Sequence, residues 1–357
     1  MRGHKTIKGA LLIGLIAMGL SCSKHTSTQG DDTTPPVVVK DNTFYNPLLS
    51  SGPDPWIYKK DGMFYFTSTN AVNITLWATP AISDLSKVTP KVVWSPPTTG
   101  ANSKNIWAPE LHYLQGKWYL YYTAGASSDL ATQRCFVLEN AGGDPTSGAW
   151  VDKGKIGDPA ANFFAIDGTV MEYKSKMYFI WSGQISASDA TQRIYIAEMS
   201  DPWTLKSARV QISKPDYDWE KRGSSVNEGP EALISPSGTA FVVYSGSNCA
   251  TDDYGLGMLR LKDNGDPLNP ADWTKSATPV FSKSINNNVF GPGHNGFFKS
   301  KDDKEDWIVY HANSQSGLGC GGTRSPRIQK FTWNTDGTPN FGEPLAVSSK
   351  LTKPSGD

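Results

Sequence analysis

The sequence lacks an excess of charge of either sign. Its 34 Lys and Arg residues balance 34 Asp and Glu residues, so the formal net charge is +0 at pH 7. A chain without a net positive field does not gather phosphate backbones or anionic membranes, and we expect no nucleic-acid partner. The sequence also lacks a Gly-rich phosphate-binding loop of either common kind, so we expect no organic cofactor.

Cysteine is scarce, and the spacing of the four cysteines matches no zinc-binding pattern. Cys135 lies in a stretch that is typical of a buried strand, where a free Cys behaves as a small apolar residue. Cys249 and Cys320 each follow the end of an aromatic strand. Because the export signal described next implies a compartment that permits disulfides, we hypothesise that these two residues are paired.

The apolar N-terminal stretch 10–20 is too short to span a bilayer comfortably. It follows basic residues, as in an export signal, and it leads to Cys22 in a context that resembles a bacterial lipoprotein cleavage site. We therefore expect residues 1–21 to be a lipoprotein-type signal peptide and residues 22–40 to be a disordered tether. The expected membrane contact is a lipid on Cys22. The expected location is the periplasm or the outer membrane, with secretion as the alternative.

Helical periodicity is almost absent, and short β-branched and aromatic runs bounded by turn residues recur instead. One type of segment occurs five times: an acidic or His-containing start, a short strand, a polar turn and an aromatic strand. The five copies are marked by Asp54, Glu110, Asp167, Glu228 and His294, at intervals of 56, 57, 61 and 66 residues. A period of this length holds the four antiparallel strands of one propeller blade. We predict an all-β, single-domain, five-bladed β-propeller over residues 41–357, with a two-layer sandwich as the alternative.

A propeller gathers residues that are distant in the sequence, because the innermost strand of each blade runs along a central channel. Asp54, Asp167 and Glu228 are therefore predicted to point into one funnel. Glycoside hydrolysis needs one carboxylic acid to protonate the leaving oxygen and one carboxylate on the opposite face of the sugar. A third carboxylate nearby can keep one of them protonated by raising its pKa. The high aromatic content, 11%, also suits stacking on sugar rings.

Five short motifs occur in order and at blade spacing: Pro53-Asp54-Pro55, Trp107-Ala-Pro-Glu110, Ile166-Asp167-Gly168, Asn227-Glu228-Gly-Pro-Glu231 and Gly291-Pro-Gly-His294-Asn295. Through these motifs the chain resembles the family 43 glycoside hydrolases from about residue 44 to the C-terminus. The resemblance implies that Asp54 is the general base and Glu228 the general acid. It implies that Asp167 raises the pKa of the acid and orients it. It also implies inversion of configuration, with a water activated by Asp54 and no covalent sugar intermediate.

Further site residues follow from the resemblance. Glu231 competes with Glu228 for the role of the acid, but we prefer Glu228, because Glu231 aligns with Glu110 and the two are expected to share a structural role. His294 is expected to face the channel and to contact a calcium ion largely through water, or else to be a hydrogen-bonded histidine without metal. Arg324 is expected to bind a sugar hydroxyl, with Arg327 close enough to be mistaken for it.

Trp107 is a candidate wall of the sugar pocket, with packing between blades as the alternative. The function that the resemblance favours is an exo-acting α-L-arabinofuranosidase, a monomer that releases terminal arabinose from arabinan or arabinoxylan of plant cell walls. The segments around His294 and Arg324 look like those of single-domain arabinan-active members. The chain ends at Asp357 after the fifth blade, whereas β-xylosidases of the family commonly carry a further β-sandwich. The alternatives are an endo-α-1,5-L-arabinanase, a β-xylosidase and, from another class, a non-catalytic glycan-binding propeller.

Overall fold

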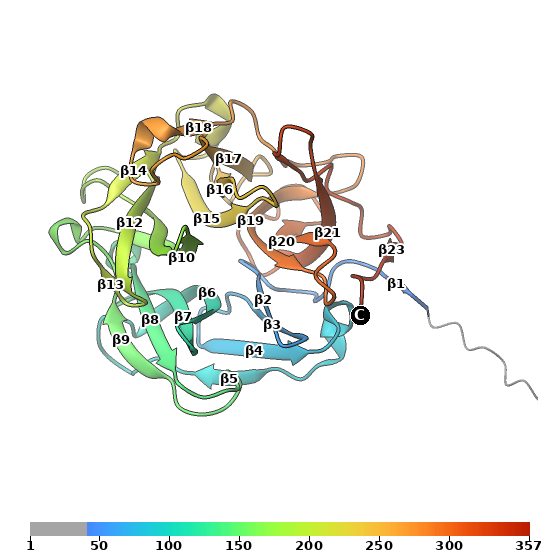
Figure 1. Cartoon of the computed structure of the whole chain (residues 1–357), viewed down its shortest axis with the longest axis horizontal. Helices are drawn as coiled ribbons and strands as arrows, with labels where there is room; N and C mark the ends of the chain where they lie inside the picture. Colours follow the sequence, from blue (N-terminus) through green and yellow to red (C-terminus); the bar gives the residue numbers. More distant parts are fainter. Residues whose placement is uncertain (1–40) are drawn as a thin grey trace, which may run out of the picture. The chain divides into compact units, whose positions relative to one another are not determined.

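The computed structural model describes residues 41–357, and most of their strands form five sheets arranged around one centre (Figure 1). Residues 42–357 form one compact unit. The expected signal peptide 1–21, the lipid on Cys22 and the tether 22–40 lie outside the described residues. Within residues 41–357, no helix has the length and apolar character that crossing a membrane requires.

Each sheet is one blade of a β-propeller, made of strands that are consecutive in the sequence and antiparallel to their neighbours. Blade 1 contains β2 (Trp56–Lys60), β3 (Met63–Thr67), β4 (Ile74–Thr79) and β5 (Lys91–Trp94). Blade 2 contains β6 (Lys104–Leu114), β7 (Lys117–Gly125), β8 (Arg134–Asn140) and β9 (Val151–Lys155). Blade 3 contains β10 (Ala165–Tyr173), β11 (Lys176–Gly183), β12 (Arg193–Asp201), β13 (Thr204–Leu205) and β14 (Val210–Ser213), the last paired with β12.

Blades 4 and 5 complete the ring (Figure 1). Blade 4 contains β15 (Asn227–Ile234), β16 (Ala240–Gly246), β17 (Gly255–Leu261) and β18 (Trp273–Lys275). Blade 5 contains β19 (Phe290–Lys299), β20 (Asp306–Asn313), β21 (Ser325–Trp333) and β22 (Pro339–Asn340). The remaining elements are the pair β1 (Thr43–Phe44) and β23 (Leu351–Thr352), and the 3-10 helices η1 (Ile82–Lys87), η2 (Leu130–Thr132), η3 (Pro159–Ala161), η4 (Asp218–Lys221) and η5 (Pro270–Asp272). The prediction of an all-β five-bladed propeller is confirmed.

The ring is closed by the segment that precedes blade 1. The N–H of Leu48 donates to the carbonyl of Pro326 at 2.8 Å. The side chain of Asn46 donates to the carbonyl of Ile328 at 2.9 Å and accepts from its N–H at 3.0 Å. Both partners belong to β21, so the chain leading into the first blade runs beside a strand of the last.

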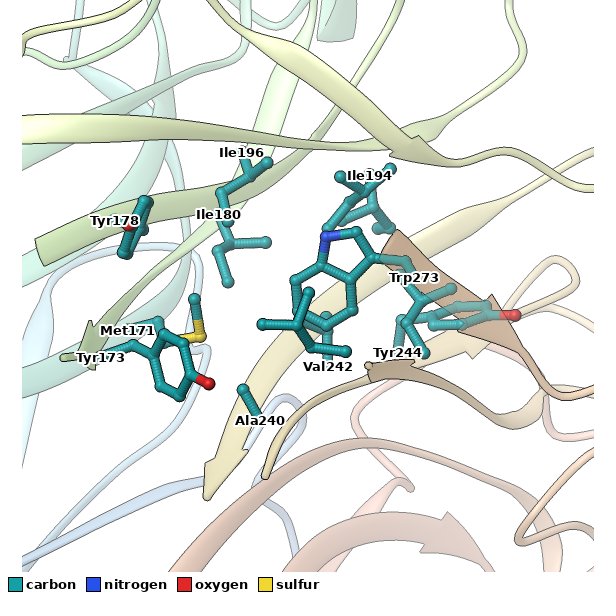
Figure 2. Packing of buried hydrophobic residues seen from close by; sticks show 13 residues of the cluster. Met171, Tyr173, Tyr178, Ile180, Ile194, Ile196, Ala240, Val242, Tyr244 and Trp273 are labelled. Atoms are coloured by element: carbon teal, nitrogen blue, oxygen red, sulfur yellow. The ribbon is translucent and has the colours of Figure 1, made fainter. Parts of the chain in front are cut away.

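Apolar side chains pack between neighbouring blades and fix their positions. Figure 2 shows one such cluster, in which Ile180 and Ile196 of blade 3 meet Val242 of blade 4, all three 0% exposed. Burial of an Ile or Val side chain contributes about 1.5–3 kcal/mol. Similar clusters join the other blades. The inner strands β2, β6, β10, β15 and β19 contact one another in turn around the centre.

Each inner strand carries a backbone irregularity at the corresponding place. One residue with positive φ occupies this place at or just before the start of each inner strand, as follows: Asp54 (53°), Ala108 (41°), Asp167 (56°), Gly229 (52°) and His294 (45°). β6 and β19 each contain a second such residue nearer their start, Asn105 (54°) and Gly291 (56°). In β6, β10, β15 and β19 the residue of the series of five lies within a β-bulge, and Asp54 lies just before β2. A positive φ is unfavourable for residues other than Gly and is typical of functional sites. A bulge also redirects the side chain that it carries.

We call these five the bulge ring, and they give the register of the repeat. Three of the five predicted markers belong to it. The other two do not, because Glu228 precedes the bulge residue of blade 4 by one position and Glu110 follows that of blade 2 by two. Glu231 also follows its bulge residue by two positions, so Glu110 and Glu231 are equivalent residues.

Candidate active site

A cavity of about 700 Å³, which we call the carboxylate cavity, opens where the inner strands begin. All six predicted site residues line it: Asp54, Trp107, Asp167, Glu228, His294 and Arg324. A hollow of about 920 Å³ lies elsewhere, lined by the turns at 172–174, 234–239, 260–264 and 334–337, and holds none of them. Convergence of carboxylates, not volume, therefore identifies the candidate site.

Asp54 lies beside an arginine and two histidines. Nη1 of Arg324 donates to Oδ1 of Asp54 at 2.9 Å, and Nδ1 of His294 and Nδ1 of His311 each lie 3.5 Å from the same oxygen. Burial raises the pKa of Asp54, but the charge of Arg324 opposes burial, and the net pKa lies well below its ordinary value. Asp54 is therefore ionised at neutral pH, as a general base must be.

The pKa of Glu228 is shifted upward, in the opposite direction to that of Asp54. Burial raises the pKa of Glu228. The hydroxyl of Tyr254 donates to Oε1 of Glu228 at 2.9 Å and lowers this pKa, whereas the negative charge of Asp54 raises it. The net result is a pKa of about 7 for Glu228. A carboxyl group with this pKa still carries its proton in a large fraction of molecules at neutral pH, as a general acid must.

Asp167 links blade 3 to the peptide next to Glu228. Its Oδ2 accepts from the N–H of Gly229 at 3.0 Å, and its own N–H donates to Oγ1 of Thr123 at 3.0 Å. Burial raises the pKa of Asp167 well above its ordinary value, and repulsion from Glu228 and then Asp54 adds to this effect. The geometry suits a residue that orients Glu228.

Glu231 lies deeper in the channel than Glu228 and does not line the cavity. It is 2% exposed, and Oγ1 of Thr169 donates to its Oε2 at 3.3 Å. Burial, followed by the charge of Glu110 and a hydrogen bond with it, raises the pKa of Glu231 well above its ordinary value. Glu110 in turn contacts Nε2 of His112 at 2.9 Å. Position therefore favours Glu228 as the acid, and Glu110 and Glu231 share one buried setting.

The two arginines near the C-terminus lie in different places. Arg324 reaches the cavity, whereas Arg327 is fully buried in β21 and donates through Nη2 to Oγ of Ser314 at 2.9 Å. Arg324 is therefore the arginine of the site. Trp107 is half-buried and exposes part of its ring to the cavity, which favours a wall of the pocket over packing between blades.

Neither His311 nor Tyr254 was predicted from the sequence to be a site residue. Nδ1 of His311 accepts from the N–H of Asp54 at 3.0 Å, and its ring stacks on that of Tyr254 with centroids 5.8 Å apart. Burial, followed by the charge of Arg324, lowers the pKa of His311 well below its ordinary value, so its imidazole is neutral. A histidine in an otherwise apolar second strand was a signal for His311, whereas Tyr254 follows a loop and carries none.

His294 lies on the channel with its N–H bonded to Oγ of Ser245 at 2.8 Å. The side-chain amide of Asn295 is buried, and neither its oxygen nor its nitrogen has a hydrogen-bond partner among the described residues. Residues 41–357 contain no group of three or more His, Cys, Asp or Glu residues that could hold a metal ion. Calcium prefers several oxygen ligands. These residues therefore fit a hydrated ion touched from one side, not an ion enclosed by protein ligands.

A disulfide borders the cavity. Cys249 and Cys320 are bonded, with Cα atoms 5.2 Å apart, which confirms the predicted pairing. Both residues line the cavity, and they join the loop after β16 in blade 4 to the loop before β21 in blade 5. Cys135 is a free and buried cysteine, also as predicted.

Comparison with known proteins gives concordant relatives. An extracellular exo-α-(1→5)-L-arabinofuranosidase of Streptomyces avermitilis is 40% identical over 85% of this chain and 64% of its own length. The α-L-arabinofuranosidase 43 of Humicola insolens is 37% identical over the same two shares. The chain thus spans less than two thirds of the length of these relatives. The crystal structure of an α-L-arabinofuranosidase from Lactobacillus brevis is 37% identical, with a TM-score of 0.81 over 86% of this chain and 98% of that one.

The sequence profile of glycosyl hydrolases family 43 matches residues 44–339. This range runs from the closing segment of the ring to the last strands of blade 5 and includes every residue that lines the carboxylate cavity. By its sequence and by its fold, the chain therefore belongs to glycosyl hydrolase family 43.

Proposed function

We propose that this protein is an inverting glycoside hydrolase that releases terminal α-L-arabinofuranosyl residues from arabinan or arabinoxylan. One observation carries the proposal. A carboxylate with a lowered pKa, Asp54, and a carboxyl group with a raised pKa, Glu228, line the same cavity. Such a pair supplies a base and an acid at one pH. The choice of arabinose as the sugar rests on the names of the relatives.

In the proposed reaction, ionised Asp54 takes a proton from a water molecule, and the water oxygen forms a bond to the anomeric carbon. The bond from that carbon to the leaving oxygen breaks, and Glu228 gives its proton to this oxygen. The anomeric configuration is inverted, and no covalent sugar intermediate forms. Each carboxyl group then returns to its starting protonation state through solvent.

Three neighbours support this pair. Asp167 orients Glu228 through the N–H of Gly229. Arg324 keeps Asp54 ionised and retains further guanidinium donors for a sugar hydroxyl, because its Nη1 makes the contact with Asp54. Trp107 offers an aromatic face at the cavity wall on which the apolar face of the sugar can pack.

We also propose that His294 contacts a hydrated calcium ion, with the unpaired amide oxygen of Asn295 as its neighbour. Such an ion would supply positive charge near His294, whose Nδ1 lies 3.5 Å from Oδ1 of Asp54. The proposal predicts that exhaustive chelation lowers both the melting temperature and the activity, and that added Ca²⁺ restores both. Unchanged melting and activity after chelation would leave His294 as a hydrogen-bonded channel histidine.

The relatives named extracellular support export of this chain. We propose that it is anchored through a lipid on Cys22 and acts as a monomer. Replacement of Cys22 by Ala should move the protein from the membrane fraction to the soluble one. An unchanged distribution would contradict the lipid anchor. Light scattering measures the molecular mass in solution and so tests whether the protein is a monomer.

The assay that tests the function measures sugar release from an aryl α-L-arabinofuranoside, an aryl β-xyloside and linear arabinan. We expect release of single arabinose units from the first and third substrates, with the inverted anomer as the first product in NMR spectra. Longer oligosaccharides from arabinan would indicate an endo-arabinanase instead. Binding to arabinan with no release from any substrate would contradict an enzyme altogether.

A further inference from the structure

The loop that carries Arg324 is rich in glycine. It connects β20 to β21 over residues 314–324 and contains Gly317, Gly319, Gly321 and Gly322. Gly317 and Gly319 have φ values of 78° and 63°, in the region that Gly adopts readily. Most of the loop is exposed. A loop of this composition loses much conformational entropy when it is fixed, so its ordered position needs specific ties.

A short series of contacts leads from the disulfide to the general base. Cys320 is bonded to Cys249, and the next residue, Gly321, accepts through its carbonyl from both the N–H and the Nε of Arg324, each at 3.3 Å. Nη1 of the same guanidinium then donates to Oδ1 of Asp54 at 2.9 Å. The residue that holds the arginine side chain is therefore covalently adjacent to the bridged cysteine.

A second tie between blades 4 and 5 lies further from the arginine. The carboxylate of Asp252 accepts from the N–H of Gly317 at 2.9 Å and from Oγ of Ser316. These contacts fix the start of the loop, whereas the disulfide fixes the part that ends in Arg324. The two ties can therefore be broken separately.

We propose that the Cys249–Cys320 disulfide is a positioning element for Arg324, which places the guanidinium on Asp54 and so makes hydrolysis dependent on the oxidised state of this bond. The inference rests on the proposed function, since it assigns a role in that same site. The disulfide acts through Arg324 and takes no part in proton transfer. Reduction of the disulfide should therefore lower kcat/KM by no more than the removal of the Arg324 side chain does.

The test is a double-mutant cycle on kcat/KM for an aryl α-L-arabinofuranoside. The four proteins are the wild type, Cys249→Ala/Cys320→Ala, Arg324→Ala and the triple variant. Misplacement of a positioning group by about 1 Å can cost ~10²-fold in rate. We expect the loss of the disulfide to lower kcat/KM by roughly 10- to 100-fold when Arg324 is present and by less than about 3-fold when it is absent. An equal fold-loss in both backgrounds would overturn the proposal.

Reduction of the folded wild type provides a second measurement that does not depend on refolding of variants. A thiol reductant should reproduce the loss of activity in the wild type and leave the Cys249→Ala/Cys320→Ala variant unchanged. The matched control is Asp252→Ala, which removes the hydrogen bonds from the loop to blade 4 and should lower kcat/KM less than removal of the disulfide. A larger loss from Asp252→Ala, or full activity of the reduced wild type, would overturn the proposal. A wild type that releases no arabinose in its oxidised form would instead refute the proposed function.

Discussion

Two rings of residues, two positions apart on the same five inner strands, differ in what surrounds their carboxyl groups. The bulge ring contains Asp54, Ala108, Asp167, Gly229 and His294. The second ring, two positions further along each strand, contains Trp56, Glu110, Thr169, Glu231 and Gly296. Each ring holds two carboxyl groups in a buried setting. Only the bulge ring opens into the carboxylate cavity, where Glu228 joins it.

The difference shows that burial alone does not make a carboxyl group catalytic. Burial raises the pKa of Glu231 as it raises that of Glu228. In the second ring the neighbour of Glu231 is another carboxyl group, Glu110, whereas in the bulge ring Asp54 meets the guanidinium of Arg324. Arg324 is hydrogen-bonded to Asp54 and lowers its pKa, whereas at Glu228 burial outweighs the charge of the same arginine. The pKa values of Asp54 and Glu228 are therefore separated, and the cavity admits the substrate.

Among substitutions in the two rings, Asp54→Asn is expected to cause the largest loss of activity. An amide cannot accept the proton of the attacking water, so kcat should fall by ~10³-fold or more, within the range that general-base catalysis supplies. The loss should be similar for arabinan and for activated aryl glycosides, because the base acts on water whatever the leaving group. Initial rates on both substrates, with circular dichroism as a check of folding, measure it. Comparable activity of the variant and the wild type would contradict the role of Asp54.

The next comparison sets Glu228→Ala against Glu231→Ala. Loss of the acid should lower kcat/KM on arabinan by ~10²- to 10⁴-fold, with a much smaller loss on an aryl glycoside whose leaving group needs no proton. Glu231→Ala should instead leave kcat/KM within a few-fold and reduce the free energy of unfolding by about 1–3 kcal/mol, since it removes the hydrogen-bond partner of the buried Thr169 hydroxyl and one of the partners of Glu110. If Glu231→Ala lost activity in this way and Glu228→Ala lost mainly stability, Glu231 would be the acid.

A smaller effect is expected on the pH dependence of kcat/KM. Glu228 must be protonated to act as the acid, so activity should decline as pH rises through about 7, its pKa. The hydroxyl of Tyr254 stabilises the ionised form and lowers that pKa. Tyr254→Phe should therefore shift the alkaline limb to higher pH. A shift to lower pH, or none, would show that Glu228 does not govern this limb.

The smallest effect concerns stability alone. The pKa of Glu231 is raised in the folded state, so between about pH 4.3, the usual value for Glu, and that raised pKa the folded chain binds more protons than the unfolded chain. Stability then falls as pH increases through this window. Glu231→Gln removes this contribution, and its melting temperature should gain on that of the wild type as pH rises. Parallel melting curves at all pH values would contradict a protonated Glu231.

The repeat in the sequence was sufficient to predict five blades and to bring Asp54, Asp167 and Glu228 to one cavity. The register within each blade could not be predicted, because a bulge depends on which backbone hydrogen bonds form between two strands. For this reason Glu110 served as the marker of blade 2 beside Asp54 and Asp167, although it belongs to the second ring. The contact of His311 with Asp54 joins residues 257 positions apart, and no local pattern indicates such a pair.

The closing segment of the ring leads directly to Asp54, the proposed general base. After Leu48 has paired with β21, the N–H of Gly52 donates to the carbonyl of Arg324 at 3.0 Å, and Asp54 follows two residues later. The seam of the propeller and the floor of the sugar pocket are thus one continuous stretch of chain. If this seam opened, the catalytic carboxylate would leave with it while blades 2, 3 and 4 were still folded. Inactivation by heat or denaturant would then precede loss of β-structure, and activity would report on the seam before spectroscopy reports on the blades.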